Sequence, residues 1–390
     1  MISALMPTYE RADLAFDRGE GAYLFASDNV RYLDFMAGIA VSALGHNHPH
    51  LVGALREQAG KIWHCSNIFR IPEGERLAAR LVERTFADSV FFNNSGAEAV
   101  ECGLKMIRKY YDDMGEPDRY RVITCEGSFH GRTLATISAA GGKNIKGFEP
   151  ALEGFDQVSF GNLNEMRAAI RPDTAAVLVE PVQGEGGIRV GDVDYLRGLR
   201  AICDEFGLLL FFDEIQCGMG RTGRLFAHEW AGVTPDIMAV AKGLAGGFPI
   251  GACLATEKTA RVLTPGSHGS TFGGNPLAMA IANAVLDVML EEGFLAHVNT
   301  VAAELRSGLE DLVKRHPKVL AEVRGMGLIL GLKCVVENKA LLVRLRKNRM
   351  LVVVGSENVV RLLPPLIIEK AHVEEALAIL DETCVELEAA

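Results

Sequence analysis

From about Ala87 onward, apolar runs of four to six residues alternate with segments of helical periodicity. Runs of this kind suit strands that are buried on both faces, and the intervening helices cover those faces. The pattern therefore predicts an α/β fold, with a mainly parallel sheet and helices on both of its sides. The expected strands are Ser89–Asn93, Arg121–Cys125, Ala175–Glu180, Leu208–Asp213, Asp236–Ala241 and Gly251–Ala255.

The two ends of the chain differ from this middle region. Residues Tyr23–Phe35 predict two short strands joined by a polar turn, followed by a helix near Leu51–Ile62. After Asn275, a long helical pattern over 276–298 leads into further helix and into strands such as 327–334. We therefore expect a separate carboxy-terminal domain that begins near residue 280.

The composition of the chain limits its partners. A formal net charge of -10 argues against nucleic acid and anionic membranes, and no stretch approaches the roughly 18 uninterrupted apolar residues of a membrane helix. The eight cysteines form no C-x-x-C pair, which favours a reducing compartment. The histidines of "HNHPH" (His46, His48, His50) lack a carboxylate or cysteine at a ligand spacing. We therefore expect a cytoplasmic protein with no metal, nucleic-acid or membrane partner.

Lys242 is the residue that most needs a chemical explanation. It lies in "DIMAVAKGLAGGFPIGA", between an apolar run and a cluster of glycines. An unpaired ammonium in such surroundings costs several kcal/mol or gives up its proton. A partly deprotonated lysine can condense with an aldehyde, so the position favours covalent chemistry.

Polar residues follow several of the expected strands, where open α/β sheets bind their ligands. Ser95 and Gly96 lie between a strand and a helix, and they predict either a phosphate site or a simple capping box with Glu98. Phe129 could stack on a flat ring, and Arg132 could bind a carboxylate, although core packing and a surface ion pair are alternatives.

The segment "LLLFFDEIQCGMGRTG" adds Asp213 and Gln216 at the end of another strand. Its G-x-G-x-x-G pattern is a weak dinucleotide signal, because Thr234–Pro235 stops any following helix. At the carboxyl end of a strand, the carboxylate of Asp213 could pair with a cationic heterocycle. Alternatively, Asp213 could be a solvent-exposed acid of a loop. Other candidates are Glu180, Glu185, Ser270, Thr271 and Arg361. Glu185 is a possible ion-pair partner of Arg361.

One ligand would explain these residues together, namely a phosphorylated pyridine aldehyde. Lys242 would form a Schiff base with the aldehyde, and Asp213 would keep the ring nitrogen protonated so that the ring withdraws electrons. Ser95, Gly96 and the Thr271 loop would receive the phosphate.

Taken together, these motifs resemble those of the class III pyridoxal-phosphate aminotransferases. They run through nearly the whole chain as "RYLDFMAGIAVSALGHNHP", "NNSGAEA", "SFHGRT", "EPVQGEGG", "FFDEIQCGMGRTG", "PDIMAVAKGLAGGFPIGA", "HGSTFGGNP" and "RLLPPL". The resemblance implies a fold type I homodimer with a seven-stranded type of sheet and active sites shared between subunits. It also implies an amino-terminal segment (1–50) that contributes to the small domain, a large domain (51–280) that binds pyridoxal 5'-phosphate, and a small α+β domain (281–390).

The resemblance also assigns the site residues. Lys242 would be the Schiff-base lysine and Asp213 the partner of the pyridinium nitrogen. Thr271 would reach the phosphate from the neighbouring subunit, with Ser270 beside it near the substrate. The remaining cofactor contacts would be Ser95, Gly96, Ala97, Phe129, His130 and Gln216.

Within the family, the resemblance is to enzymes that act on acetylornithine. It implies transfer of an amino group from N-acetyl-L-ornithine to 2-oxoglutarate, giving N-acetyl-L-glutamate 5-semialdehyde and L-glutamate in arginine biosynthesis. Arg132 would hold the distant carboxylate of either substrate, and Arg361 would bind the second carboxylate of glutamate or pair with Glu185. Alternatives are ornithine, succinylornithine or 4-aminobutyrate as donor, an aminomutase, and a non-catalytic cofactor-binding protein.

Overall fold

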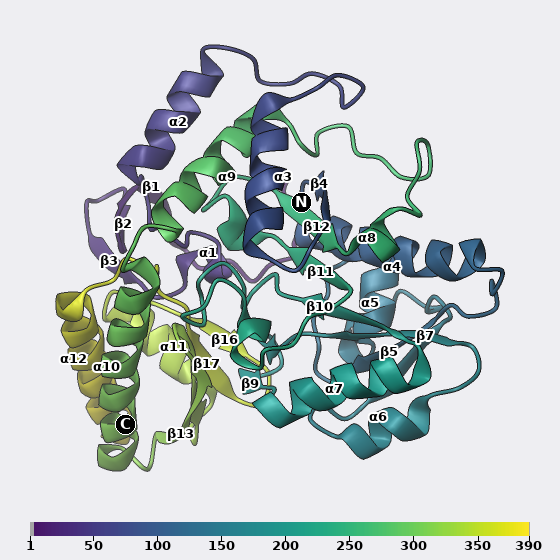
Figure 1. The fold of residues 1–390 in the computed structure, drawn as a ribbon. Coiled ribbons are helices and arrows are strands. Elements are labelled where there is room, and N and C mark those ends of the chain that lie inside the picture. The colour runs from purple at the N-terminus through teal and green to yellow at the C-terminus, as the bar shows by residue number, and fades with distance from the viewer. Residues whose placement is uncertain (1–3, 390) are drawn as a thin grey trace.

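A seven-stranded sheet forms the centre of the molecule in the computed structural model, which describes residues 4–389 (Figure 1). Strand β12 is antiparallel to both of its neighbours, β11 and β4, and the other pairings are parallel. In spatial order the strands are β4 (Ser89–Asn93), β12 (Gly251–Ala255), β11 (Ile237–Val240), β10 (Leu209–Asp213), β7 (Thr174–Val179), β5 (Arg121–Cys125) and β6 (Phe155–Val158). The predicted fold class and its mainly parallel sheet are confirmed.

Strand β6 is the one member of this sheet that the sequence did not predict. It has only four residues, FDQV, at the edge of the sheet beside β5. An edge strand pairs on one side only and buries less of its surface, so it does not show the apolar run that marks a central strand.

Helices cover both faces of the sheet because successive strand residues point to opposite sides. Leu209 and Phe211 of β10 pack in the core that includes α4, whereas Leu210 and Phe212 pack in the core that includes α7. The helices of this region are α2 (Pro49–Ala59), α3 (Pro72–Arg84), α4 (Gly96–Asp113), α5 (Leu134–Ala140), α6 (Leu163–Ala169), α7 (Val193–Phe206), α8 (Glu257–Ala260) and α9 (Pro276–Met289).

The long helix predicted over 276–298 is in fact two helices. The first, α9, begins after Asn275, whose side chain accepts a hydrogen bond from the N–H of Ala278. The next, α10 (Phe294–Arg315), begins after Gly293, which has a positive φ of 90°. Glycine adopts this conformation without strain, so the chain changes direction there while the apolar pattern continues.

The two ends of the chain meet in one sheet. Strand β15 (Met350–Leu351) runs parallel to β3 (Arg31–Asp34), which pairs in turn with β2 (Tyr23–Ala26) and β1 (Phe16–Glu20). A second four-stranded sheet packs nearby with α10, α11 (Asn338–Lys347) and α12 (Lys370–Glu388) (Figure 1). Its strands are β13 (Leu320–Met326), β14 (Ile329–Cys334), β17 (Val359–Leu362) and β16 (Val353–Gly355).

The remaining elements are short. They are α1 (Ala37–Ala40), β8 (Val182–Gln183), β9 (Arg189–Val190), and the 3₁₀ turns η1 (Gly142–Asn144), η2 (Ala227–Trp230) and η3 (Lys242–Leu244). Within residues 4–389, no helix combines the length and the apolar character that a membrane crossing requires.

Candidate active site

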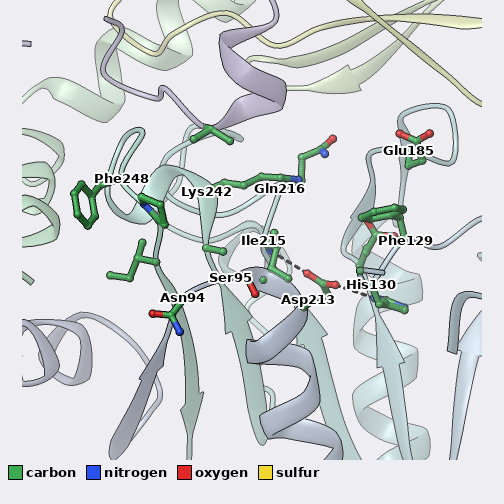
Figure 2. Close-up of a pocket in the computed structure, with 18 of the residues that line it drawn as sticks. Asn94, Ser95, Phe129, His130, Glu185, Asp213, Ile215, Gln216, Lys242 and Phe248 are labelled. Carbon is green, nitrogen blue, oxygen red and sulfur yellow. Dashed lines mark hydrogen bonds and ion pairs between the residues drawn. The ribbon is translucent and has the colours of Figure 1, made fainter. Parts of the chain in front are cut away.

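A cavity of about 360 Å³ lies where the central strands end and the following loops begin (Figure 2). Figure 2 shows Lys242 and Phe248 on one side of it and Phe129 with Glu185 on the other. Nine of the predicted site residues line the cavity, namely Ser95, Gly96, Ala97, Phe129, His130, Glu185, Asp213, Gln216 and Lys242. Arg132, Ser270, Thr271 and Arg361 do not line it in this single chain.

Lys242 follows β11 and begins the turn η3 with a positive φ of 45°. A non-glycine residue in this region is strained, and such strain is often stored at functional sites. Burial lowers the pKa of Lys242 to about 8, although the charges of Asp213 and Glu180 act in the opposite direction. Within residues 4–389 its amine forms no hydrogen bond, and a larger share of it is neutral near pH 8 than for an exposed lysine.

Asp213 ends β10 and is 2% exposed. Its Oδ1 accepts a hydrogen bond from the N–H of Ile215 at 3.0 Å, and its Oδ2 lies 2.8 Å from Nδ1 of His130. Burial lowers the pKa of His130, but the hydrogen bond and charge of Asp213, with the charge of Glu180, outweigh burial and raise the pKa overall. The geometry fixes a carboxylate at the floor of the cavity, where it can pair with a cationic ring nitrogen.

Ser95 caps α4 as predicted, but the capping box is incomplete because Glu98 bonds to the N–H of Asn94 and not to that of Ser95. Its Oγ accepts a hydrogen bond from the N–H of Glu98 at 3.3 Å, and Glu98 Oε2 accepts one from the N–H of Asn94 at 2.9 Å. The first N–H groups of a helix have no acceptor within the helix, and those of Gly96 and Ala97 belong to residues that line the cavity. The cap by Ser95 and an anion site are therefore compatible.

Two glycines bring the cavity walls close together. A Cβ on Gly96 would lie 2.8 Å from Cδ1 of Ile215, and a Cβ on Gly184 would lie 1.8 Å from Oε1 of Gln216. Among the residues that the structure describes, the buried Gln216 Oε1 has no hydrogen-bond partner, and neither has Nε2 of His130. Buried polar atoms are rarely unpaired in a complete site.

These features fit a phosphorylated aromatic aldehyde. Lys242 supplies an amine of lowered pKa, Asp213 a fixed carboxylate, and the start of α4 free N–H groups for a phosphate. The unpaired Gln216 Oε1 offers a hydrogen-bond acceptor for a ring substituent. Phe129 lines the cavity and offers an aromatic face.

Arg361 lies on β17 and is 2% exposed. Its Nη2 donates hydrogen bonds to Glu185 Oε2 at 2.7 Å and to the carbonyl of Val354 at 2.8 Å, so the ion pair suggested by the sequence is present. Its Nε and Nη1 have no hydrogen-bond partner in the described part of the chain. Burial lowers the pKa of Arg361, and the charge of Glu185 opposes this shift. The guanidinium therefore has unused donors next to a cavity-lining carboxylate.

The other three predicted residues lie outside the cavity wall. Arg132 is exposed, donates a hydrogen bond to Asn144 Oδ1 at 2.7 Å, and has its guanidinium carbon 4.8 Å from the centre of the Phe129 ring. Ser270 Oγ accepts a hydrogen bond from Asn94 Nδ2 at 3.1 Å, whereas Thr271 is exposed.

Sequence reasoning assigned no role to several residues that line the cavity. Glu180 was visible as an acid after a strand, but its proximity to Asp213 depends on how the strands pair. Val41 comes from the amino-terminal segment, and no local signal connects it with Lys242. Ile215, Phe248 and Asn94 also line the cavity without a distinctive sequence pattern.

Two of the three histidines of "HNHPH" lie against different carboxylates. His46 Nε2 lies 2.7 Å from Asp34 Oδ2, and His50 Nε2 lies 3.0 Å from Asp287 Oδ2. Across the described part of the chain, no three His, Cys, Asp or Glu side chains are grouped as metal ligands.

Comparisons with known proteins agree with this geometry. The family model for class-III aminotransferases matches residues 6–384. An acetylornithine aminotransferase of Brucella melitensis is 58% identical over 386 residues, which cover 99% of this chain and 96% of that protein. The solved N-acetylornithine aminotransferase of Stenotrophomonas maltophilia is 38% identical, with a TM-score of 0.87 and 98% of each chain covered.

A solved ornithine aminotransferase of Toxoplasma gondii, whose active site is partly occupied by pyridoxal phosphate, is also similar. It is 31% identical, with a TM-score of 0.94, and the match covers 98% of this chain and 93% of that one. The match to the family model and to these relatives extends over nearly the whole chain, and the cavity holds a lysine, an aspartate and a helix start suited to this cofactor. The chain therefore belongs to the class-III aminotransferases, a family of pyridoxal-phosphate-dependent enzymes.

Proposed function

We propose that this protein transfers an amino group from N-acetyl-L-ornithine to 2-oxoglutarate, which yields N-acetyl-L-glutamate 5-semialdehyde and L-glutamate in arginine biosynthesis. The names of relatives such as the Brucella melitensis enzyme support this choice of donor. The observation that carries the proposal is the ion pair between Glu185 and Arg361 beside the cavity of Lys242.

This ion pair provides a switch between two substrates. In acetylornithine, the carbon that carries the reacting amine is a terminal CH₂ with no charged substituent besides the amine. In glutamate, the carbon that carries the reacting amine also carries a carboxylate. With Glu185 paired to Arg361, the charge near that carbon is balanced, which suits the first substrate. When Glu185 moves away, Arg361 binds the carboxylate of the second through two parallel hydrogen bonds. Arg132 holds the far carboxylate that both substrates share.

Pyridoxal phosphate, when bound, supplies an aldehyde for covalent attachment and a ring that accepts electrons from the substrate carbon. Lys242 would provide the amine that attaches the cofactor and, once released, would hold and move a proton at its Nζ. Asp213 keeps the ring nitrogen protonated, and His130 orients Asp213 through the hydrogen bond at Oδ2. Phe129 would cover a ring face, and Gln216 would bond a ring substituent. Ser95, Gly96 and Ala97 would hold the phosphate.

A homodimer would complete the site. Thr271 is exposed in this chain, so it can reach the phosphate of a neighbouring subunit, with Ser270 close to that subunit's substrate. The divisions at 50 and 280 define the large and small domains of each subunit, although residues 1–3 and 390 lie outside the described residues. The cytoplasm is the proposed location.

A donor panel tests the proposal. The purified, cofactor-loaded protein is mixed separately with acetylornithine, succinylornithine, ornithine and 4-aminobutyrate, and the rate of cofactor absorbance change gives kcat/KM for each. We expect acetylornithine to react fastest, with 2-oxoglutarate required for turnover. Ornithine is the second candidate, because the similar Toxoplasma gondii structure is an ornithine aminotransferase. Fastest reaction with ornithine would replace the proposed donor.

Glu185→Ala tests the switch. Without its carboxylate, Arg361 stays cationic and unpaired, so kcat/KM for acetylornithine should fall while that for glutamate is kept or rises. Hydrogen bonds to charged groups contribute about 1.5–3 kcal/mol, which corresponds to a change in the ratio of roughly ten-fold or more. Glu322→Ala, which removes an exposed carboxylate, is the control. An unchanged ratio in Glu185→Ala would exclude the switch.

A further inference from the structure

Glu180 is a buried carboxyl group of the cavity that the roles above leave unused. It follows β7, whose residue Val179 lies opposite Phe212 of β10 in parallel register. The next residue of each strand is Glu180 and Asp213, respectively. Two carboxyl groups are therefore neighbours at the carboxyl ends of adjacent strands, and both line the cavity.

The contacts of Glu180 join two loops on the same side of the cavity (Figure 2). Its Oε1 accepts a hydrogen bond from the N–H of Phe129 at 2.8 Å, and its Oε2 accepts a longer one from the N–H of Gly184 at 3.4 Å. Phe129 presents its ring to the cavity, and Glu185 follows Gly184 directly. One side chain thus holds both the aromatic wall and the loop that carries the partner of Arg361.

The charge of Glu180 also acts on its neighbours. Burial raises the pKa of Glu180 to about 7, and the nearby charge of Asp213 adds to the increase. In the other direction, the negative charge of Glu180 favours the protonated form of Lys242. The ionisation of Glu180 and the proton affinity of the Lys242 nitrogen are therefore linked across the cavity.

We propose that Glu180 is a positioning residue of the active site, which holds the Phe129 and Gly184 loops through its two oxygens and tunes the proton affinity of the Lys242 nitrogen through its charge. The two parts of this role can be separated by substitution. Glutamine keeps an oxygen for the N–H of Phe129 but has no charge, whereas alanine removes both. The inference rests on the proposed function only for the choice of amino donor.

The charge is tested by spectroscopy of the cofactor-loaded protein without any substrate. The absorbance of the bound cofactor is titrated between pH 5 and about 10 in the wild type, in Glu180→Gln and in Glu126→Gln, an exposed acid that follows the neighbouring strand β5. Because removal of a negative charge weakens proton binding at the Lys242 nitrogen, we expect the midpoint of Glu180→Gln to fall by roughly one pH unit, a ten-fold loss of proton affinity. Glu126→Gln should match the wild type.

The hydrogen bonds are tested by kinetics and by thermal unfolding. Glu180→Ala should lower kcat roughly ten-fold with acetylornithine and with glutamate, because the N–H groups of Phe129 and Gly184 lose their shared acceptor and both loops lose their position. Glu180→Gln should restore most of kcat without restoring the midpoint. If Glu180→Ala does not fold, the pH midpoint of the cofactor absorbance in Glu180→Gln tests the proposal alone.

A Glu180→Gln midpoint equal to that of Glu126→Gln, or a folded Glu180→Ala variant with wild-type kcat, would overturn the proposal. A failure of the proposed function looks different, because acetylornithine would then not react with the wild type, while the midpoint shift, which needs no donor, would remain.

Discussion

Lys242→Ala is expected to lower kcat for the overall transamination by about 10³-fold or more. The variant loses both the amine that attaches the cofactor and the group that carries the proton, and proton transfer by a positioned side chain alone contributes roughly 10²–10⁴-fold. The protein should still fold, because the Lys242 amine forms no hydrogen bond in the described part of the chain. Burial also disfavours the charge of this amine, so its removal should not destabilise the fold. Steady-state kinetics and thermal unfolding measure the two effects.

Matched variants show whether this effect is chemical. Lys242→Arg keeps a cation of similar length but cannot attach the cofactor, so it should be as inactive as alanine. Lys318→Ala, at an exposed position, should be fully active. Borohydride reduction followed by mass spectrometry should find the cofactor on residue 242 of the wild type. A reduced cofactor on another lysine would contradict the assignment.

The lowered pKa of Lys242 gives this attachment a pH dependence. Below about pH 8 the free amine is mostly protonated and cannot attack an aldehyde, and above that pH it is mostly neutral. The rate at which cofactor-free protein takes up pyridoxal phosphate should therefore rise with pH and level off above about 8. An ordinary exposed lysine would show a rise that continues to about 10.

Asp213→Asn is expected to lower kcat by roughly 10²–10³-fold while the cofactor stays attached. The amide keeps an oxygen for the N–H of Ile215, so the loop after β10 is preserved. It loses the negative charge that we propose pairs with the ring nitrogen. Breaking a buried pair costs about 3–5 kcal/mol, and the part of this cost that is felt in the transition state lowers the rate.

Controls separate this loss of charge from a loss of structure. Asp194→Asn removes an exposed charge in the first turn of α7 and should not change kcat. Mass spectrometry of reduced Asp213→Asn should still find the cofactor on Lys242. If Asp213→Asn retained wild-type kcat, the ring nitrogen would not depend on this carboxylate, and His130 would be oriented for another purpose.

Much of the fold was predictable because its signals are local. Central strands such as Leu209–Asp213 are buried on both faces, so each is a continuous apolar run that a reader of the sequence can recognise. The edge strand Phe155–Val158 and the break at Gly293 were missed because a half-covered strand loses its apolar pattern, while a glycine turn can leave an apolar pattern unbroken.

The sequence by itself determined the chemistry of the site. A lysine in an apolar segment and acids and small polar residues after strands point to one cofactor, since an uncompensated charge needs a reason wherever the chain folds. Only the tertiary structure decided which of these groups act on one another. The parallel pairing of β7 with β10 brings Glu180 beside Asp213, and β17 brings Arg361 to Glu185 across 176 positions. Contacts of this kind depend on the pairing of distant strands, and hydrophobic periodicity carries no information about which strands become neighbours.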